Sequence, residues 1–192
     1  MERDGPRGFV LSWARVTYRH YALRRVPGNT SGLPSLFVSV VQPTEGGRVL
    51  VGRMSSSTAA PGLWQLPGGS VEPPEGDGML DEPALRRHAT RELVEEIGVD
   101  LAPEELHLWV IIRGETRNVG VVFLAPPRPE AELRERFETV VAAERALGGV
   151  PELDWIAMVT GPDGVAALEG PHVDYLEPLV RRYGAAALRR ST

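Results

Sequence analysis

The chain has 192 residues, a formal net charge of −5 and no cysteine, so it is long enough for one well-buried domain. The acidic balance offers no basic footprint for a nucleic acid polymer, and the lack of cysteine excludes disulfides, thiolate catalysis and cysteine-based zinc sites. The 21 basic residues other than histidine are all arginine, which excludes a lysine nucleophile. No apolar run approaches the roughly 18 residues of a membrane span. We therefore expect a cytoplasmic protein with no membrane partner.

The first part of the chain, residues 1–34, is polar and rich in turn-forming residues. It predicts an N-terminal arm that precedes a single domain over residues 35–192. Apolar residues between Trp13 and Tyr21 allow one short strand in this arm. The arm is either partly ordered or pairs with a sheet edge or a second subunit in a homodimer, and the sequence leaves these alternatives open.

Apolar runs bounded by turn formers predict strands along the rest of the chain. In chain order these are Ser35 to Val41, Arg48 to Arg53, Gly62 to Leu66, Leu106 to Arg113, Asn118 to Leu124 and Glu152 to Val159. Apolar residues at helical spacing predict three helices. These are a helix capped by Asp81 or Glu82 and ending near Ile97, then Pro129 to Leu147, then His172 to Tyr183. This order indicates an α+β or α/β sandwich with a mixed β-sheet.

The end of the first predicted helix carries three carboxylates, Glu92, Glu95 and Glu96. At about 100° per residue, Glu95 and Glu96 lie roughly 60° and 40° on either side of Glu92, so all three share one arc of the helix. An apolar stripe runs along the edge of this arc, which places Glu96 beside core-facing residues. An unpaired carboxylate is expensive there, and a hard divalent cation such as Mg2+ would offset its charge.

The nine residues from Arg91 to Val99, Arg-Glu-Leu-Val-Glu-Glu-Ile-Gly-Val, resemble the signature of the Nudix hydrolase family in its MutT-like form. That signature is Gly, five residues, Glu, seven residues, then Arg-Glu-apolar-any-Glu-Glu-any-Gly-apolar. The last nine positions match completely, and Gly69 and Glu75 have the five-residue gap. From Gly76 to Thr90 there are 15 residues, eight more than the signature has. The Gly, Asp and Pro content of the excess indicates a longer loop rather than a longer helix.

The resemblance implies a Nudix fold, an α/β/α sandwich with a mixed sheet between helices. It also implies Mg2+- or Mn2+-dependent hydrolysis of the pyrophosphate bond of a nucleoside diphosphate linked to another moiety. By the same resemblance, the Gly68 carbonyl, Glu92, Glu95 and Glu96 hold the metal, Glu92 or Glu95 is the general base, and Arg91 orients carboxylates. Nucleotide-sugars, ADP-ribose and (d)NTPs are all open as small-molecule substrates. The alternative is a non-hydrolytic Nudix-fold nucleotide sensor, which the altered spacing before Arg91 favours.

Other acidic residues are candidates for the same site. Glu72 either joins the metal shell or lies on the loop, and Glu75 is the family's partner position for Arg91. A further acid from a later loop has four candidates, Glu115, Glu144, Glu152 and Asp154. We select Glu144 because it follows two apolar positions at helical spacing, although a salt link to an arginine is the simpler interpretation.

Few sequence patterns indicate which residues contact the substrate. Arg53, Arg113 and Arg117 are candidates for phosphate or ribose, against the simpler alternative of surface arginines. Trp64 either stacks on a base or packs under its loop. His88, one turn before Glu92, either supports that carboxylate or is exposed. Two further tryptophans, Trp109 and Trp155, are predicted to be core residues.

Overall fold

The structure is a computed structural model that describes residues 2–4, 8–17, 26, 34–74, 76, 78–114 and 117–190. The chain forms two compact units, Met1–Ser35 and Leu36–Thr192. No helix in the described part of the chain is long and apolar enough to cross a membrane.

The first unit contains a small antiparallel hairpin, in which β1 (Glu2–Asp4) pairs with β2 (Gly8–Val10). Residues 11–17 form no strand, so the strand predicted to begin at Trp13 is wrong for this part. Its remainder, from Tyr18 to Tyr21, lies outside the described residues. A role of this arm in a homodimer stays a prediction.

The second unit contains all the strands and helices predicted for it. Its strands are β3 (Leu36–Val41), β4 (Val49–Met54), β5 (Trp64–Gln65), β6 (His107–Arg113), β7 (Val119–Leu124) and β8 (Leu153–Val159). Its longer helices are α2 (Glu82–Ile97), α3 (Glu130–Ala146) and α5 (Leu176–Arg190). The short helices η3 (Pro103–Glu105) and α4 (Gly161–Ala166) were not predicted.

The strands form two three-stranded sheets. In the first, β7 lies between β3, with which it is parallel, and β6, with which it is antiparallel, so this sheet is mixed as predicted. In the second, β4 lies between β5 and β8, and both pairings are antiparallel. A parallel pair such as β3 and β7 needs a long crossover, and the chain between them includes β4, β5, α2 and β6.

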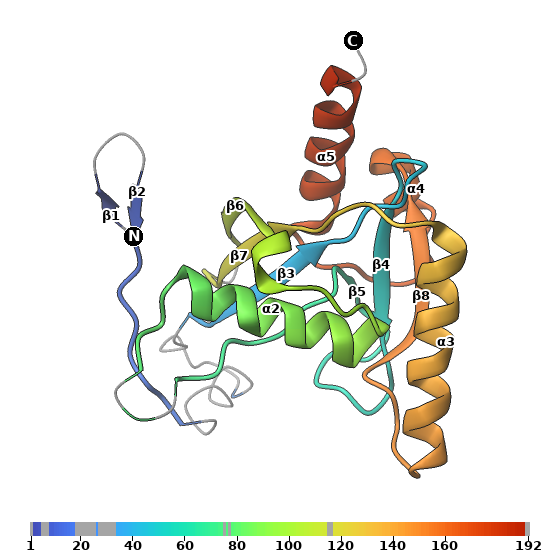
Figure 1. Ribbon diagram of the computed structural model, residues 1–192, viewed down its shortest axis with the longest axis horizontal. Helices are drawn as coiled ribbons and strands as arrows, with labels where there is room; N and C mark the ends of the chain where they lie inside the picture. The colour runs from blue at the N-terminus through green and yellow to red at the C-terminus, as the bar shows by residue number, and fades with distance from the viewer. Residues whose placement is uncertain are drawn as a thin grey trace. The chain divides into compact units, whose positions relative to one another are not determined.

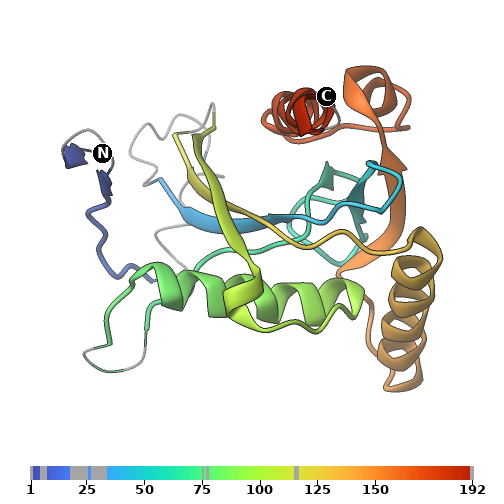
Figure 2. The same ribbon diagram turned by 45° about the horizontal axis from the view of Figure 1, so that its top comes forward.

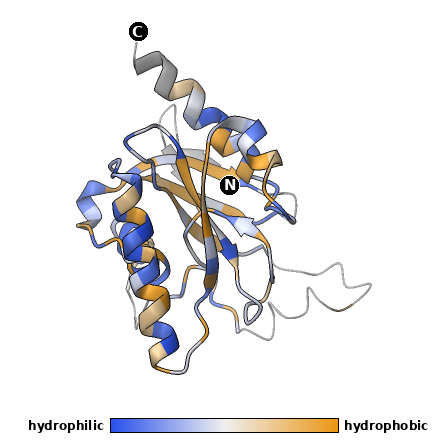
Figure 3. Ribbon diagram, turned by 90° about the vertical axis from the view of Figure 1, so that its right-hand side faces the viewer, coloured by the Kyte–Doolittle hydropathy of each residue, from blue (hydrophilic) through white to orange (hydrophobic). Residues whose placement is uncertain are grey.

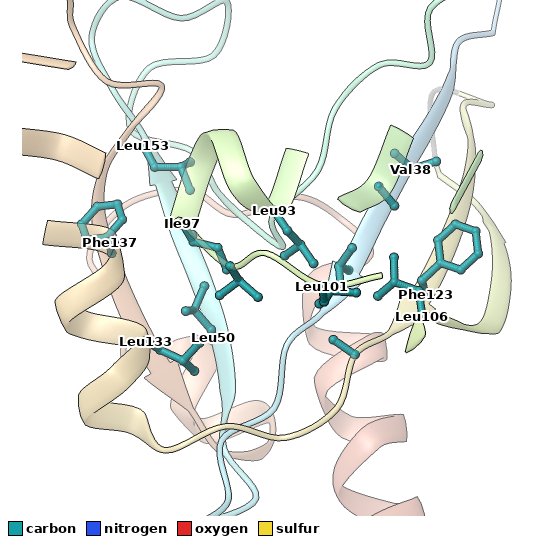
Figure 4. Close-up of a cluster of buried hydrophobic side chains, with 14 of the residues drawn as sticks. Val38, Leu50, Leu93, Ile97, Leu101, Leu106, Phe123, Leu133, Phe137 and Leu153 are labelled. Carbon is teal, nitrogen blue, oxygen red and sulfur yellow. The ribbon is translucent and has the colours of Figure 1, made fainter. Parts of the chain in front are cut away.

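Helices cover both faces of the strands, as Figures 1 and 2 show. One core cluster joins α2 and α3 to the strands through Leu93, Ile97, Leu133 and Phe137, which point toward Leu50 and Leu153 in Figure 4. The other core cluster joins α4 and α5 to the opposite face and includes Val165, Leu176 and Leu179. Apolar residues concentrate along the strands between the helices (Figure 3). The predicted α/β/α layering is confirmed.

Helix α2 is held at both ends and along one side. The Asp81 side chain accepts a hydrogen bond from the Ala84 N–H at 2.9 Å, which caps the first turn. Gly98 adopts a left-handed conformation with φ of 69° and ends the helix. Leu93 and Ile97 are fully buried. The helix therefore presents its glutamates from a fixed position.

Leu93→Ala should lower the free energy of unfolding by about 2–5 kcal/mol, because it removes a fully buried side chain from a packed core. The matched control is Val94→Ala on the same helix, where the side chain is 41% exposed and the loss should stay within about 0.5 kcal/mol. Urea unfolding of both variants measures the difference. Equal losses would contradict the assignment of Leu93 as the anchor of α2.

Candidate functional site

The turn after β5 brings backbone next to the glutamates of α2. It runs along β3, where the Val40 N–H donates to the Pro67 carbonyl at 2.8 Å and the Val38 N–H donates to the Gly69 carbonyl at 3.0 Å. Gly68 has a φ of 144°, and a side chain there would overlap the Val38 carbonyl. At Gly69, an added Cβ would lie 2.6 Å from a Glu92 carboxylate oxygen. Glycine at both positions therefore lets β3 and α2 approach the turn from opposite sides.

Glu96 joins the turn to the helix. Its Oε2 atom accepts a hydrogen bond from the Gly68 N–H at 2.7 Å, and the residue is only 3% exposed. Its Oε1 atom is buried and has no hydrogen-bond partner among the described residues. Burial raises the pKa of Glu96 well above its usual value, the bond from Gly68 opposes this, and the charges of Glu152, Glu92 and Glu95 add to the rise.

Glu152 is the fourth acid of this cluster. It directly precedes β8, and its carbonyl accepts a hydrogen bond from the Ser55 N–H at 2.8 Å. Glu152 keeps an exposed surface, but partial desolvation raises its pKa, and the charges of Glu92 and Glu95 raise it further. The structure thus brings Glu152 to the carboxylates of α2.

The acid selected from the sequence, Glu144, does not belong to this cluster. Glu144 is exposed near the end of α3, and its charge is not among those that act on Glu96 or Glu152. Helical spacing predicted that Glu144 leans toward the apolar face of its helix, and this is wrong because the last turn of α3 is exposed. Spacing within α3 also contains no information about which loop meets α2. Among the other candidates, Asp154 pairs with Arg53, and Glu75 and Glu115 lie outside the described residues.

His88 and Arg91 form a chain of polar contacts that ends at Glu92. The Arg91 Nη2 atom lies 2.7 Å from His88 Nδ1 and 3.6 Å from Glu72 Oε2. His88 Nε2 lies 3.0 Å from Glu92 Oε1, although this pair is not aligned as a hydrogen bond. His88 is only 8% exposed, so the expectation of an exposed histidine is wrong. Arg91 thus reaches the carboxylates through His88, and Glu72 lies on the loop beside Arg91.

The carboxylates fit a hard divalent cation. Within the described ranges, no three acidic or histidine side chains converge closely enough to hold a metal ion. The Glu96 carboxylate is bonded to Gly68, and the Glu92 carboxylate lies beside His88 and Gly69. The buried Oε1 atom of Glu96 nevertheless has no partner, and several negative charges act on it. Carboxylate and carbonyl oxygens are the ligands that Mg2+ and Mn2+ prefer.

Two residues predicted to contact substrate, Trp64 and Arg53, form hydrogen bonds with other residues of the protein. Trp64 is only 4% exposed, and its indole N–H donates to the Glu169 carbonyl at 2.9 Å, which favours the packing alternative. The Arg53 guanidinium lies 5.9 Å from the Trp64 ring centroid and donates to Asp154 at 2.9 Å. The hydrogen bond with Asp154 is the main cause that raises the pKa of Arg53.

The predicted core tryptophans differ from each other. Trp155 is 60% exposed, so the prediction of a core position is wrong for it. Its strand β8 pairs with β4, with Arg53 directly opposite Trp155. The apolar spacing of β8 did not reveal that the sheet is exposed to solvent at this position. Trp109 is partly buried and packs edge-on against Tyr183.

An open pocket of about 400 Å³ lies where β6 meets the start of α5. Arg113, which is exposed, lines it together with Asp174 and Tyr175. Tyr175 stacks on Phe37 with ring centroids 5.2 Å apart. Burial raises the pKa of Tyr175 to about 12, a hydrogen bond with Ser39 opposes this, and the charges of Asp174 and Glu96 contribute to the rise. Tyr175 thus lines this pocket, while the pocket lining includes none of the α2 glutamates.

Sequence reasoning missed Tyr175, and it named Glu152 as a candidate acid but selected Glu144 instead. A signal for Tyr175 was present in β3, where Ser39 is a buried polar residue in an otherwise apolar strand and needs a partner. Arg117, the remaining arginine candidate, is exposed just before β7.

Comparisons with known proteins identify the family. The chain is similar to a MutT NUDIX hydrolase from Burkholderia pseudomallei, with 18% identity over 79% of this chain and 98% of that chain and a TM-score of 0.48. It is similar to a MutT protein from Methanosarcina mazei, with 20% identity over 83% of this chain and 96% of that chain and a TM-score of 0.46. No match was found among curated proteins.

A third similar structure is a bifunctional NMN adenylyltransferase/ADP ribose pyrophosphatase from Francisella tularensis. It has 13% identity over 91% of this chain and 46% of that chain, with a TM-score of 0.49. The decisive match is to a family: the sequence model of the NUDIX domain matches residues 35–156, more than half of the chain. The chain belongs to the NUDIX domain family, as its signature at Arg91 to Val99 predicted.

Proposed function

We propose that this pyrophosphohydrolase cleaves a nucleoside diphosphate linked to another moiety at a site built on α2, with Mg2+ or Mn2+ as cofactor. One observation carries the proposal: Glu96 is a buried carboxylate bonded to the Gly68 N–H, with Glu92, Glu95 and Glu152 close enough for their charges to act on it. Such a concentration of negative charge is costly unless a cation or protons balance it.

The residues that would hold the metal are Glu92, Glu95, Glu96, Glu152 and the Gly68 carbonyl. When bound, a divalent cation neutralises charge on the phosphate oxygens and activates water. Glu92 or Glu95 takes the proton of the attacking water, a role that suits a carboxylate on a rigid helix.

The pocket at the start of α5 supports a nucleotide substrate. Arg113 supplies a positive charge for a phosphate or ribose oxygen, and Tyr175 supplies a ring and a hydroxyl in the same lining. Nucleotide-sugars, ADP-ribose and (d)NTPs are the substrate classes we propose. Release of the nucleoside monophosphate from each of these with Mg2+, measured by chromatography, is the screen that separates them.

The altered spacing before Arg91 is the one observation that favours the non-hydrolytic sensor. The carboxylates oppose it, because a binding module has no need of several carboxylates near one buried, partnerless oxygen. If the metal-loaded protein hydrolyses none of the proposed substrate classes, the sensor becomes the better interpretation. A homodimer and a cytoplasmic location stay predictions.

Glu92→Gln and Glu95→Gln should each lower kcat at least about 100-fold while leaving the fold intact, because each removes a charge and a proton acceptor from the site. The matched control is Glu144→Gln, an exposed glutamate outside the cluster, which should keep normal activity. Steady-state rates with saturating Mg2+ and circular dichroism measure both effects. Normal turnover in both site variants would refute the assignment of the α2 glutamates.

Glu96→Gln should change how the stability of the metal-free protein depends on pH. The raised pKa of Glu96 means that the folded protein holds this proton more tightly than the unfolded chain does. Stability from this group therefore falls as pH rises from the ordinary carboxyl pKa, about 4.3, toward the raised folded value. The glutamine cannot ionise, so the variant should gain stability relative to the natural protein as pH rises.

Thermal unfolding in EDTA at a series of pH values measures this difference. Glu144→Gln serves as the control and should follow the natural protein at every pH, because Glu144 is exposed. Parallel curves for Glu96→Gln and the natural protein would show that Glu96 carries no uncompensated charge.

A further inference from the structure

His88 is a buried polar side chain that the proposed reaction does not use directly. It lies on α2 one turn before Glu92, and only 8% of its surface is exposed. Both ring nitrogens approach charged groups, because Nδ1 lies 2.7 Å from Arg91 Nη2 and Nε2 lies 3.0 Å from Glu92 Oε1. A histidine that merely filled the core would not need a charged neighbour on each nitrogen.

The two contacts determine where the proton of the neutral ring lies. A guanidinium has donors only, so His88 Nδ1 must accept the hydrogen bond from Arg91. The ring proton is then on Nε2, which faces the Glu92 carboxylate. His88 is therefore oriented as a donor toward Glu92.

Glu92 is confined by the residues around its carboxylate. Gly69 lies against it on one side, so close that an added Cβ would be 2.6 Å from Oε2, and His88 lies beside Oε1. Nε2 has no aligned hydrogen-bond partner among the described residues, and an unpaired buried N–H costs about 1–3 kcal/mol. Glu92 is the acceptor within reach of this atom.

We infer that His88 is a positioning residue that holds the Glu92 carboxylate in place for a divalent cation and connects it to Arg91. The inference rests on the proposed function, because it assigns Glu92 to the metal. Hydrogen bonds to a ligating side chain orient it and raise its affinity, and their loss typically weakens metal binding about 10–100-fold. Arg91 then acts on the site through the His88 ring.

Two substitutions separate the contacts of the two ring nitrogens. His88→Gln places an amide at the distance of Nε2, so it keeps a donor for Glu92. His88→Asn places its amide at the distance of Nδ1, so it keeps an acceptor for Arg91 and loses the donor for Glu92. Both variants are polar and smaller than or similar to histidine, so neither overfills the core. His107→Asn at the exposed start of β6 is the matched control.

The experiment measures Mn2+ binding to the full chain by electron paramagnetic resonance, after removal of metal with EDTA. His88→Asn should weaken Mn2+ binding about 10-fold or more, whereas His88→Gln should stay within about 3-fold of the natural protein and His107→Asn should equal it. Equal losses in both His88 variants would mean a structural role only. No loss in His88→Asn would mean that His88 does not act on the site, and either result overturns the inference.

A double-mutant cycle tests whether the effect passes through Glu92. In a Glu92→Gln background, His88→Asn should cause little additional loss of Mn2+ affinity, because the carboxylate that it positions is already absent. The same 10-fold loss in that background would show that His88 acts elsewhere, which overturns the inference. Thermal unfolding of each variant confirms that it is folded.

The same measurements distinguish this inference from the proposed function. If the natural protein binds no Mn2+, both are overturned. If it binds Mn2+ and releases a nucleoside monophosphate from a substrate while His88→Asn behaves like it in both assays, the proposed function stands and only the role of His88 is overturned.

Discussion

The hydrogen bond from the Gly68 N–H to the buried carboxylate of Glu96 is the interaction on which the site depends. It joins the turn beside β3 to the last turn of α2, and it requires glycine at position 68 because a side chain would overlap the Val38 carbonyl. It also holds a negative charge out of water. A fold optimised for stability alone would place an apolar residue here, so the burial of Glu96 is best explained by the chemistry of the site.

The surrounding structure anchors the glycine turn and α2 separately, although the connection between them has no regular structure in its described residues. The turn is fixed by backbone bonds to β3, and α2 is fixed by the cap at Asp81 and by Leu93 in the core. The described residues between Ser70 and Glu82 belong to no helix or strand. Because both ends of this connection are anchored, extra residues in it add only a small loop entropy and need not move the carboxylates.

Local patterns in the sequence predicted most of the strands and helices, and they predicted the part of the candidate site that lies on α2 and on the glycine turn. Helix α2, its cap and its glutamates follow from helical spacing, and the glycine turn follows from the signature. The choice of Glu152 among the candidate acids was not predictable in the same way, since Glu152 comes near the α2 carboxylates through tertiary contacts between distant segments. The same holds for Tyr175, which meets Phe37 and Ser39 only in the folded chain. Trp155 shows the same limit, because alternation along β8 does not reveal which part of a sheet face a helix will cover.

Anomalous diffraction from crystals of the full chain grown with Mn2+ tests most directly whether these carboxylates form a metal centre. The predicted result is a manganese peak among the side chains of Glu92, Glu95, Glu96 and Glu152. A manganese peak elsewhere on the molecule, with none among these four side chains at saturating Mn2+, would contradict the assignment of α2 as the metal-binding helix.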